Sequence, residues 1–225
     1  MGKIVAFELV TLDGVMQAPG RPDEDQRDGF THGGWAVPYA AMEASEQDRA
    51  HTSVLLGRRT YEDFYAVWPK RTGDPTTAVL NAAQKYVVSN TLSEPLPWDN
   101  STLLKGEATK TVARLKKELD RDLVVLGSRA LVRSLLRSNL IDVYVLSIHP
   151  LVLGTGSHLF TAEDTRRALR LVDVKSTLLA FSSRLTWQRS KPVHNEITAD
   201  LSLQPGFSCP ALLKRQVGLF LRAYT

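Results

Sequence analysis

Residues 122–136, DLVVLGSRALVRSLL, form a complete strand–turn–helix pattern. An apolar run of strand length leads into a Gly-Ser turn, and a helical pattern follows over residues 130–137. The same order recurs where SVLLG, residues 53–57, leads into a helical stretch over residues 60–68. Strands that alternate with helices of this length predict a mainly parallel sheet with helices on both faces.

The alternation extends along most of the chain. Further strands are expected at residues 3–10, 85–89, 122–127 and 143–150, and further helices at 39–50 and 111–119. After Pro150 two strand-like runs, residues 168–176 and 181–189, follow each other without a helix between them. The sequence therefore predicts a three-layer α/β/α fold with a mostly parallel central sheet and an antiparallel C-terminal edge.

The composition is that of an ordinary globular protein, and the length suits one large domain or one domain with an appendage. Its 225 residues are 43% hydrophobic and 23% charged, and the single Cys209 excludes an internal disulfide and a Cys-based zinc site. The histidines show no metal-ligand spacing, so no metal site is expected. The net charge of +4 is too small and scattered for a nucleic-acid binder. No apolar run approaches the ~20 residues of a membrane span, and the N-terminus is not a signal peptide, so a cytoplasmic protein is expected.

The segment GRRTYEDF, residues 57–64, is a candidate phosphate site. Gly57 permits a tight turn after the strand, and Thr60 is expected to cap the helix with Asp63 as its capping-box partner. Arg58 and Arg59 would stand just before that helix start, whose free amides and dipole favour an anion. The alternative is a capped helix with two solvated arginines.

Two other strand ends offer polar groups at the carboxyl edge, where ligands of open parallel sheets bind. Ser89 and Asn90 follow one strand and are candidates for a ribose or its phosphate, unless they form a plain turn. Gly127 and Ser128 precede a helix start that suits a pyrophosphate, although the Rossmann spacing is missing and a generic strand–turn–helix unit is the alternative.

Asp13 ends the first predicted strand and opens a long aperiodic segment, residues 13–35. Its carboxylate is a candidate for binding a substrate amide or amidine edge, or for polarising a proton donor. The alternative is an Asx turn that Asp13 caps itself. A loop of this length inside a compact domain is usually functional or disordered.

The order of these motifs resembles one family. TLDGVMQAPG, HGGW, LLGRRTYEDF, YVVSNTL, DLVVLGS and IHPLVLGTGSHLF follow each other over residues 3–188 as in the dihydrofolate reductase-like proteins that share the reductase domain of the riboflavin-biosynthesis deaminase-reductase. The resemblance implies NADPH across the carboxyl edge of the sheet and a homodimer. It matches Asp13 to an acidic residue near the substrate. It implies cofactor binding by Gly57, Arg58, Arg59, Thr60, Val88, Ser89, Asn90, Gly127, Ser128, Arg129, Ala130 and Leu131.

The expected function is thus hydride transfer from NADPH to a small pterin- or pyrimidine-type substrate. The alternative is a non-catalytic protein that binds NADPH or another nucleotide. Residues 1–190 are expected to form the reductase domain, and residues 191–225, outside the resemblance, a C-terminal appendage without an assigned role. The dihydrofolate reductases carry two glycines where this chain has Gly127-Ser128.

Overall fold

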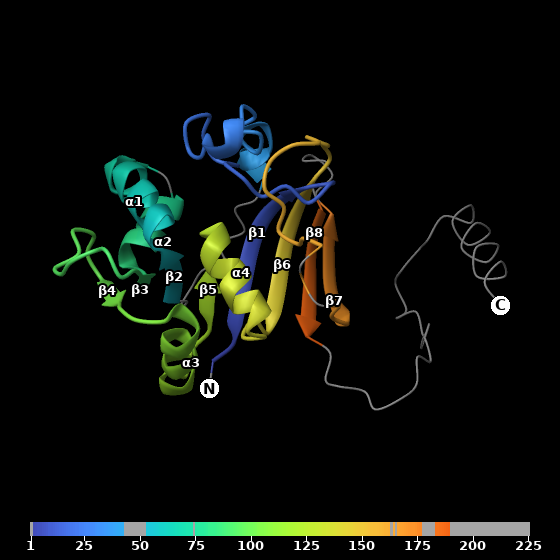
Figure 1. Ribbon diagram of the computed structural model, residues 1–225. Helices are drawn as coiled ribbons and strands as arrows, with labels where there is room; N and C mark the ends of the chain where they lie inside the picture. Colours follow the sequence, from blue (N-terminus) through green and yellow to red (C-terminus); the bar gives the residue numbers. More distant parts are fainter. Residues whose placement is uncertain are drawn as a thin grey trace, which may run out of the picture. The chain divides into compact units, whose positions relative to one another are not determined.

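The computed structural model describes residues 2–42, 53–73, 75–162, 164, 166–176 and 183–189. These residues form an eight-stranded sheet with the strand order β4-β3-β2-β5-β1-β6-β8-β7 (Figure 1). The predicted appendage, residues 191–225, lies outside the described part. The strands are β1 Ile4–Thr11, β2 Ser53–Gly57, β3 Lys85–Val88, β4 Ser101–Leu104, β5 Leu123–Val125, β6 Val143–His149, β7 Leu169–Ser176 and β8 Ser183–Arg189.

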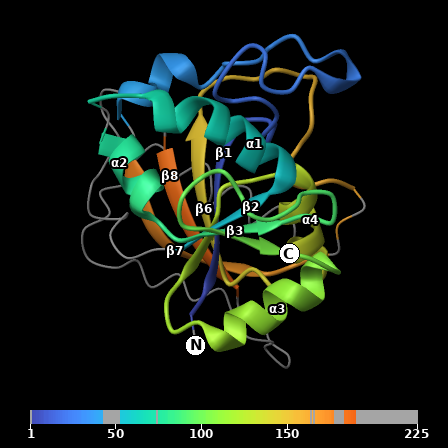
Figure 2. The same cartoon turned by 90° about the vertical axis from the view of Figure 1, so that its left-hand side faces the viewer.

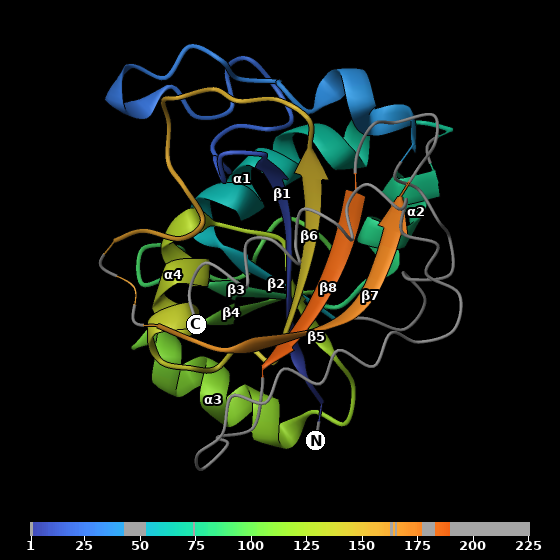
Figure 3. The ribbon, with the colours of Figure 1, turned by 90° about the vertical axis from the view of Figure 1, so that its right-hand side faces the viewer.

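Strand direction changes only at the C-terminal side of the described sheet. Strands β1 to β6 pair in parallel, whereas β8 runs antiparallel to both β6 and β7. Figure 3 shows these three strands side by side. The predicted antiparallel edge is therefore confirmed, and so is the mostly parallel sheet.

Helices cover both faces of the sheet (Figure 2). On one face, α3 and α4 share a core with β1 that includes Ile4, Val112 and Leu135. On the other face, Tyr61 of α1 and Leu80 of α2 pack against β2 and β3. This is the predicted α/β/α layering. The α-helices are α1 Arg58–Val67, α2 Pro75–Ala82, α3 Ala108–Glu118 and α4 Arg129–Arg137, and the 3-10 helices are η1 Arg27–Gly29, η2 Val37–Met42 and η4 Trp68–Lys70.

Alternation along β1 positions the site. Ile4, Ala6 and Val10 are buried in the core under α3 and α4. The intervening residues, Val5, Phe7 and Leu9, are half-buried on the opposite face. A strand whose successive side chains point to opposite faces thus supplies both a core and an apolar surface.

Several element boundaries differ from the prediction. Strand β4 and helix α2 were not predicted, although α2 begins with Pro75, a favoured first helical residue. Helix α3 begins three residues earlier than predicted. The helix expected over residues 39–50 is a 3-10 helix up to Met42, and residues 43–52 lie outside the described part. Within the described ranges, no helix is long and apolar enough to cross a membrane.

The long segment over residues 13–35 is ordered. It has a small core of its own, in which Val15, Phe30 and Trp35 are buried. Gln17 is 4% exposed, and its side-chain amide donates to the carbonyls of Asp25 and Arg27 at 3.2 and 3.1 Å. The segment has no helical or strand periodicity in its sequence because side chains, and not a regular helix or sheet, satisfy part of its backbone hydrogen bonding.

Candidate functional site

The described residues line a cleft of about 1380 Å³ along the central strands, from Val5 and Val54 near their beginnings to Gly57 and Gly127 at their carboxyl ends. Its apolar surface comes from the sheet face that bears Val5, Phe7 and Leu9. Residues 16–20 and 24–27 of the long loop form one wall, and residues 57–60 of the β2–α1 turn form another. The loop and turn walls carry charged and polar side chains, so the cleft combines an apolar floor with polar walls, as expected of a site for an extended small molecule.

The β2–α1 turn places two arginines in the first turn of α1. The N-cap is Gly57, and no side chain caps the helix. The prediction that Thr60 is the cap is therefore wrong, because α1 begins at Arg58, so Arg58 and Arg59 lie inside the helix and not before it. Arg58 forms an ion pair with Glu62 at 3.0 Å, while Arg59 is exposed and lines the cleft.

Asp63 does not act as the predicted capping-box partner either. Its carboxylate accepts hydrogen bonds from the guanidinium of Arg21, one of them at 3.1 Å. Since Arg21 belongs to the long loop, this ion pair ties the loop to α1. Glu24, also in the loop, accepts from the backbone amide of Gly20 at 2.6 Å, and burial raises its pKa.

The β5–α4 turn repeats this arrangement. Ser128 is the N-cap of α4, and its side chain makes no capping hydrogen bond. Gly127 has a φ of +83°, which favours glycine, and the Gly127-Ser128 peptide is cis. Arg129 lines the cleft at the first position of the helix. Burial and the positive charges of Arg27 and Arg133 lower the pKa of Arg129.

The two turns contact each other through their glycines. The Gly57 amide donates to the Gly127 carbonyl at 3.4 Å. A Cβ atom on Gly57 would lie 2.2 Å from Oγ of Ser128, and one on Gly127 would lie 3.3 Å from Oγ1 of Thr60. The uncapped N-termini of α1 and α4 therefore meet at one place, and their free amides and dipoles favour a negatively charged group there.

Ten of the twelve predicted cofactor-binding residues line this cleft. The two that do not are Ser89 and Asn90. The Ser89 hydroxyl accepts from the amides of Thr91 and Leu92, both at 3.1 Å, and the Asn90 side chain accepts from the Gly106 amide at 2.7 Å. These contacts favour the turn interpretation of this segment. The ten lining residues are Gly57, Arg58, Arg59, Thr60, Val88, Gly127, Ser128, Arg129, Ala130 and Leu131.

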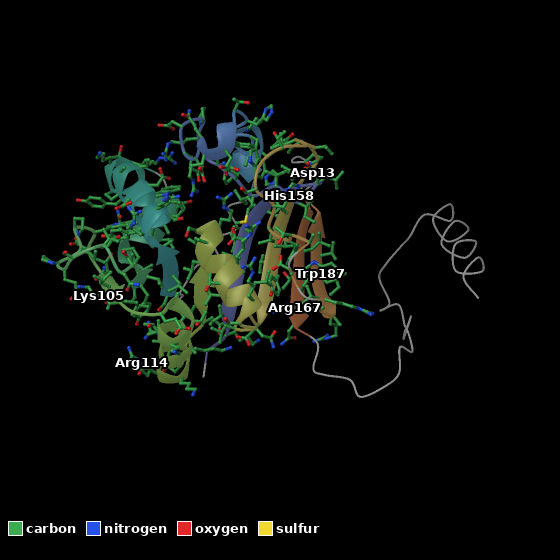
Figure 4. All side chains as sticks on the ribbon, viewed as in Figure 1. Asp13, Lys105, Arg114, His158, Arg167 and Trp187 are labelled. Atoms are coloured by element: carbon green, nitrogen blue, oxygen red, sulfur yellow. The ribbon has the colours of Figure 1, made fainter. Side chains whose placement is uncertain are left out.

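Asp13 lies outside the lining of the cleft. Figure 4 shows it at the same end of the molecule as His158 and far from Arg114 on α3. Its carboxylate accepts from the amides of Gly154 at 2.8 Å and Leu153 at 3.2 Å. Burial raises its pKa, but hydrogen bonds from Thr11, Gly154 and Leu153 outweigh that effect and lower it. These contacts give Asp13 a structural role, but they bind it to the distant residues Leu153 and Gly154 and not within the Asx turn that was the predicted alternative.

Glu8 is a cleft residue that the sequence prediction missed. It lies on β1, is 6% exposed and lines the cleft. Burial raises its pKa to about 8, and a hydrogen bond from the backbone of Gly127 opposes that shift. The signal was present in the sequence, since Glu8 is the one charged residue within the apolar run IVAFELV.

His149 is a second buried titratable residue, and its contacts indicate a structural role. Its Nδ1 lies 3.1 Å from the Ser147 carbonyl oxygen, and its ring makes edge contacts with Trp35 and Tyr39. In the portion of the chain that is described, no cluster of three His, Cys, Asp or Glu residues is arranged to hold a metal ion.

The chain is similar to several known proteins. It is 28% identical over 180 residues to the uncharacterized protein YyaP of Bacillus subtilis (strain 168), a match that covers 77% of this chain and 88% of YyaP. A putative riboflavin biosynthesis protein from Shewanella sp. PV-4 has the same fold, with a TM-score of 0.57 and 19% identity over 84% of this chain and 99% of that one.

A dihydrofolate reductase from Enterococcus faecalis, solved with NADP(H) and RAB-propyl, gives a TM-score of 0.50 at 14% identity over 84% of this chain and 98% of that one. These two structural likenesses concern the fold. The family model of the RibD C-terminal domain matches residues 2–180, most of the sequence. The chain belongs to the RibD C-terminal domain family.

Proposed function

We propose that this protein is an NADPH-dependent reductase that acts on a pterin- or pyrimidine-type substrate. The observation that carries the proposal is the meeting of two uncapped helix N-termini beside Arg58, Arg59 and Arg129 in one cleft. Family membership supports it, because the resemblance of the sequence implies NADPH at these same motifs.

The residues present fit a dinucleotide. Its phosphates carry negative charge, and the amides that begin α1 and α4 have no side-chain cap to compete with them. Glycine at positions 57 and 127 lets the two turns pack closely, because a Cβ atom on Gly57 would overlap Oγ of Ser128 and one on Gly127 would press on Oγ1 of Thr60. NADPH, when bound, supplies a hydride, and the protein positions the nicotinamide and excludes water.

In this proposal the two turns have different tasks. Arg59, with Arg58, holds the 2′-phosphate that distinguishes NADPH from NADH. Arg129 and the start of α4 hold the pyrophosphate. Titration of both nucleotides by fluorescence quenching tests the cofactor, and equal affinity for NADH and NADPH would contradict the proposal.

The second candidate is a nucleotide-binding protein without catalysis. It is favoured by the placement of Asp13, whose carboxylate is engaged in a turn. Dihydrofolate and 5-amino-6-(5-phosphoribosylamino)uracil should each be tested with NADPH by following the nicotinamide absorbance. Oxidation with either compound supports the reductase, and NADPH binding without oxidation supports the second candidate.

Asp13 remains a proposed catalytic residue with a direct test. If it acts near the substrate, Asp13→Asn impairs turnover more than NADPH binding. If it only fixes the turn at Leu153 and Gly154, turnover and binding fall together.

We also propose that the chain forms a homodimer. Among the described strands β7 ends the sheet, and its Leu171 and Val172 are 42% and 50% exposed. An exposed edge strand with apolar side chains is normally covered. Light scattering at micromolar concentration should give about twice the chain mass, and a mass of one chain would contradict the proposal.

A further inference from the structure

Glu8 occupies a position where an acidic side chain is costly. It is the only buried Asp or Glu among the described residues. Strand β1 lies between β5 and β6, and Glu8 pairs in register with the apolar Leu146. Its Oε1 is buried and has no hydrogen-bond partner among the described atoms. An unpartnered buried polar atom destabilises a fold, and a leucine here would not.

A second buried charged residue shows what a structural role looks like. The Lys85 ammonium donates to the carbonyl oxygens of Leu80, Asn81 and Ala83, at 2.8, 3.3 and 2.7 Å. All of its donors are used at the end of α2, which explains its burial. Glu8 has no comparable set of partners. Residues that break a local rule without structural compensation are expected at functional sites.

The surroundings of Glu8 keep its carboxyl protonated near neutral pH. Burial is the main cause of its raised pKa, and the Gly127 amide is the opposing one. The titratable side chains on the packed elements α4 and β6 are Arg129, Arg133, Arg137, Tyr144 and His149. A neutral carboxyl group is a proton donor, and a reduction that places a proton on its substrate at pH 7 requires one.

Glu8 is also adjacent to the turn to which the cofactor is assigned. Ala6 pairs with Val125 in the parallel β1–β5 register, so Glu8 and Gly127, each two residues further on, lie next to each other, and both residues line the cleft. The resemblance implies that this turn contacts the nicotinamide as well as the pyrophosphate, so an acid at this place would lie beside the nicotinamide and the substrate. Asp13, by comparison, lies outside the lining.

We propose that Glu8 is the proton-donating acid of the cleft, delivering its carboxyl proton to the substrate atom that becomes basic on reduction. The proposal rests on the proposed function. As hydride from bound NADPH adds to the carbon of a C=N or C=O bond, the π electron pair moves to the nitrogen or oxygen. That atom takes the proton as the O–H bond of Glu8 breaks. The substrate gains two hydrogens, the cofactor is left oxidised, and Glu8 regains its proton from water.

The test compares Glu8→Gln and Glu8→Asp with Glu118→Gln, a matched change at the exposed end of α3. Glu8→Gln keeps the shape but has no acidic proton. We expect kcat to fall by about 10²- to 10⁴-fold, while the Kd for NADPH changes less than about threefold, a difference of under 1 kcal/mol. Glu8→Asp should retain part of the rate, and Glu118→Gln all of it.

Infrared spectroscopy gives a readout that does not depend on activity. A protonated-carboxyl band should be present in the wild type at pH 7, lost above pH 8 and absent from Glu8→Gln. No such band in the wild type would overturn the proposal, as would full activity of Glu8→Gln. A parallel loss of NADPH affinity and kcat would show a structural role and would overturn it too.

The experiments distinguish two outcomes: that Glu8 is not the proton donor, and that the protein is not a reductase. A wild type that oxidises NADPH with dihydrofolate or the uracil substrate, together with an active Glu8→Gln, overturns only the donor. A wild type that oxidises NADPH with neither overturns both. If neither Glu8 variant folds, the wild-type rate decides, since a kcat that does not fall through pH 8 rejects Glu8.

Discussion

The β2–α1 and β5–α4 turns have the same backbone plan and opposite chemistry. In both, a glycine lies at or just after the end of the strand, a helix begins without a side-chain cap, and arginine occupies the first helical position. The β2–α1 turn presents the exposed Arg59 next to the Arg58–Glu62 pair. Both glycines are buried and both first arginines, Arg58 and Arg129, are half-buried. The β5–α4 turn differs in lying beside a buried acid, Glu8, whose pKa is raised.

The difference shows that the local sequence pattern determines where a helix N-terminus exposes its free backbone amides. Burial of the neighbouring side chains then determines how those side chains respond to salt and pH. Charges at the exposed turn act through screened electrostatics and should respond to salt. The buried turn acts through a desolvated acid and should respond to pH. Substitutions at the two turns can therefore be designed to separate them.

The largest expected effect is on stability at the buried turn. Unfolded Glu8 has a pKa of 4.5 and folded Glu8 about 8. Between these values the unfolded chain has lost a proton that the folded chain keeps, so Glu8 lowers stability as pH rises through this window. Relative to pH 4.5, Glu8→Gln should gain about 3 kcal/mol over wild type by pH 7. Urea unfolding at several pH values measures this gain, and a pH-independent difference would contradict it.

The next effect concerns nucleotide choice at the exposed turn. A charge-assisted hydrogen bond to the 2′-phosphate contributes about 1.5–3 kcal/mol, or roughly 10- to 150-fold preference for NADPH. Arg59→Ala should remove most of this preference, and Arg58→Ala less because Glu62 already pairs with it. Arg129→Ala should weaken NADPH and NADH alike.

Fluorescence titrations at low and high salt measure both quantities, with Arg114→Ala on the exposed face of α3 as the control. The preference itself should shrink with added salt. If Arg129→Ala abolishes the preference for NADPH over NADH and Arg59→Ala does not, then the β5–α4 turn binds the 2′-phosphate and the β2–α1 turn binds the pyrophosphate.

A smaller effect distinguishes the two glycines. Gly127→Ala should cost about 1–2 kcal/mol, since φ is +83°. At Gly57 the φ of −79° suits alanine, and the obstacle is the Ser128 side chain. Ser128→Gly should therefore relieve Gly57→Ala in a double-mutant cycle, whereas Thr60→Ala should not relieve Gly127→Ala. Thermal unfolding of the single and double variants provides the free energies, and additivity in the first cycle would exclude the contact.

The smallest effect tests whether the cofactor site extends to a third strand end. Ser89→Ala leaves the amides of Thr91 and Leu92 without their acceptor and should cost about 1 kcal/mol of stability. NADPH affinity should not change, because Ser89 lies outside the lining of the cleft. The exposed Ser93→Ala is the control. A tenfold loss of NADPH affinity in Ser89→Ala would restore the predicted ribose contact.

The sequence predicts the strand–helix alternation because apolar periodicity is a local property. It also identifies the two glycine turns, since glycine after a buried strand is a local signal. It did not identify Glu8, whose importance depends on what surrounds it: only the folded chain puts Leu146 and Gly127 next to that carboxyl. Asp13 shows the converse. An Asp-Gly pair at a strand end is compatible with a site or a turn, and the deciding partners, Leu153 and Gly154, are 140 and 141 residues away.

The glycine contact has an evolutionary consequence. Because a Cβ atom on Gly57 would overlap Oγ of Ser128, the residues accepted at position 57 depend on the residue at position 128. A relative with alanine at position 57 should carry glycine at position 128. The change to glycine at position 128 should have come first, because it makes room for the alanine. The two turns are thus expected to covary across the family as one inherited unit, although 71 positions separate them in the chain.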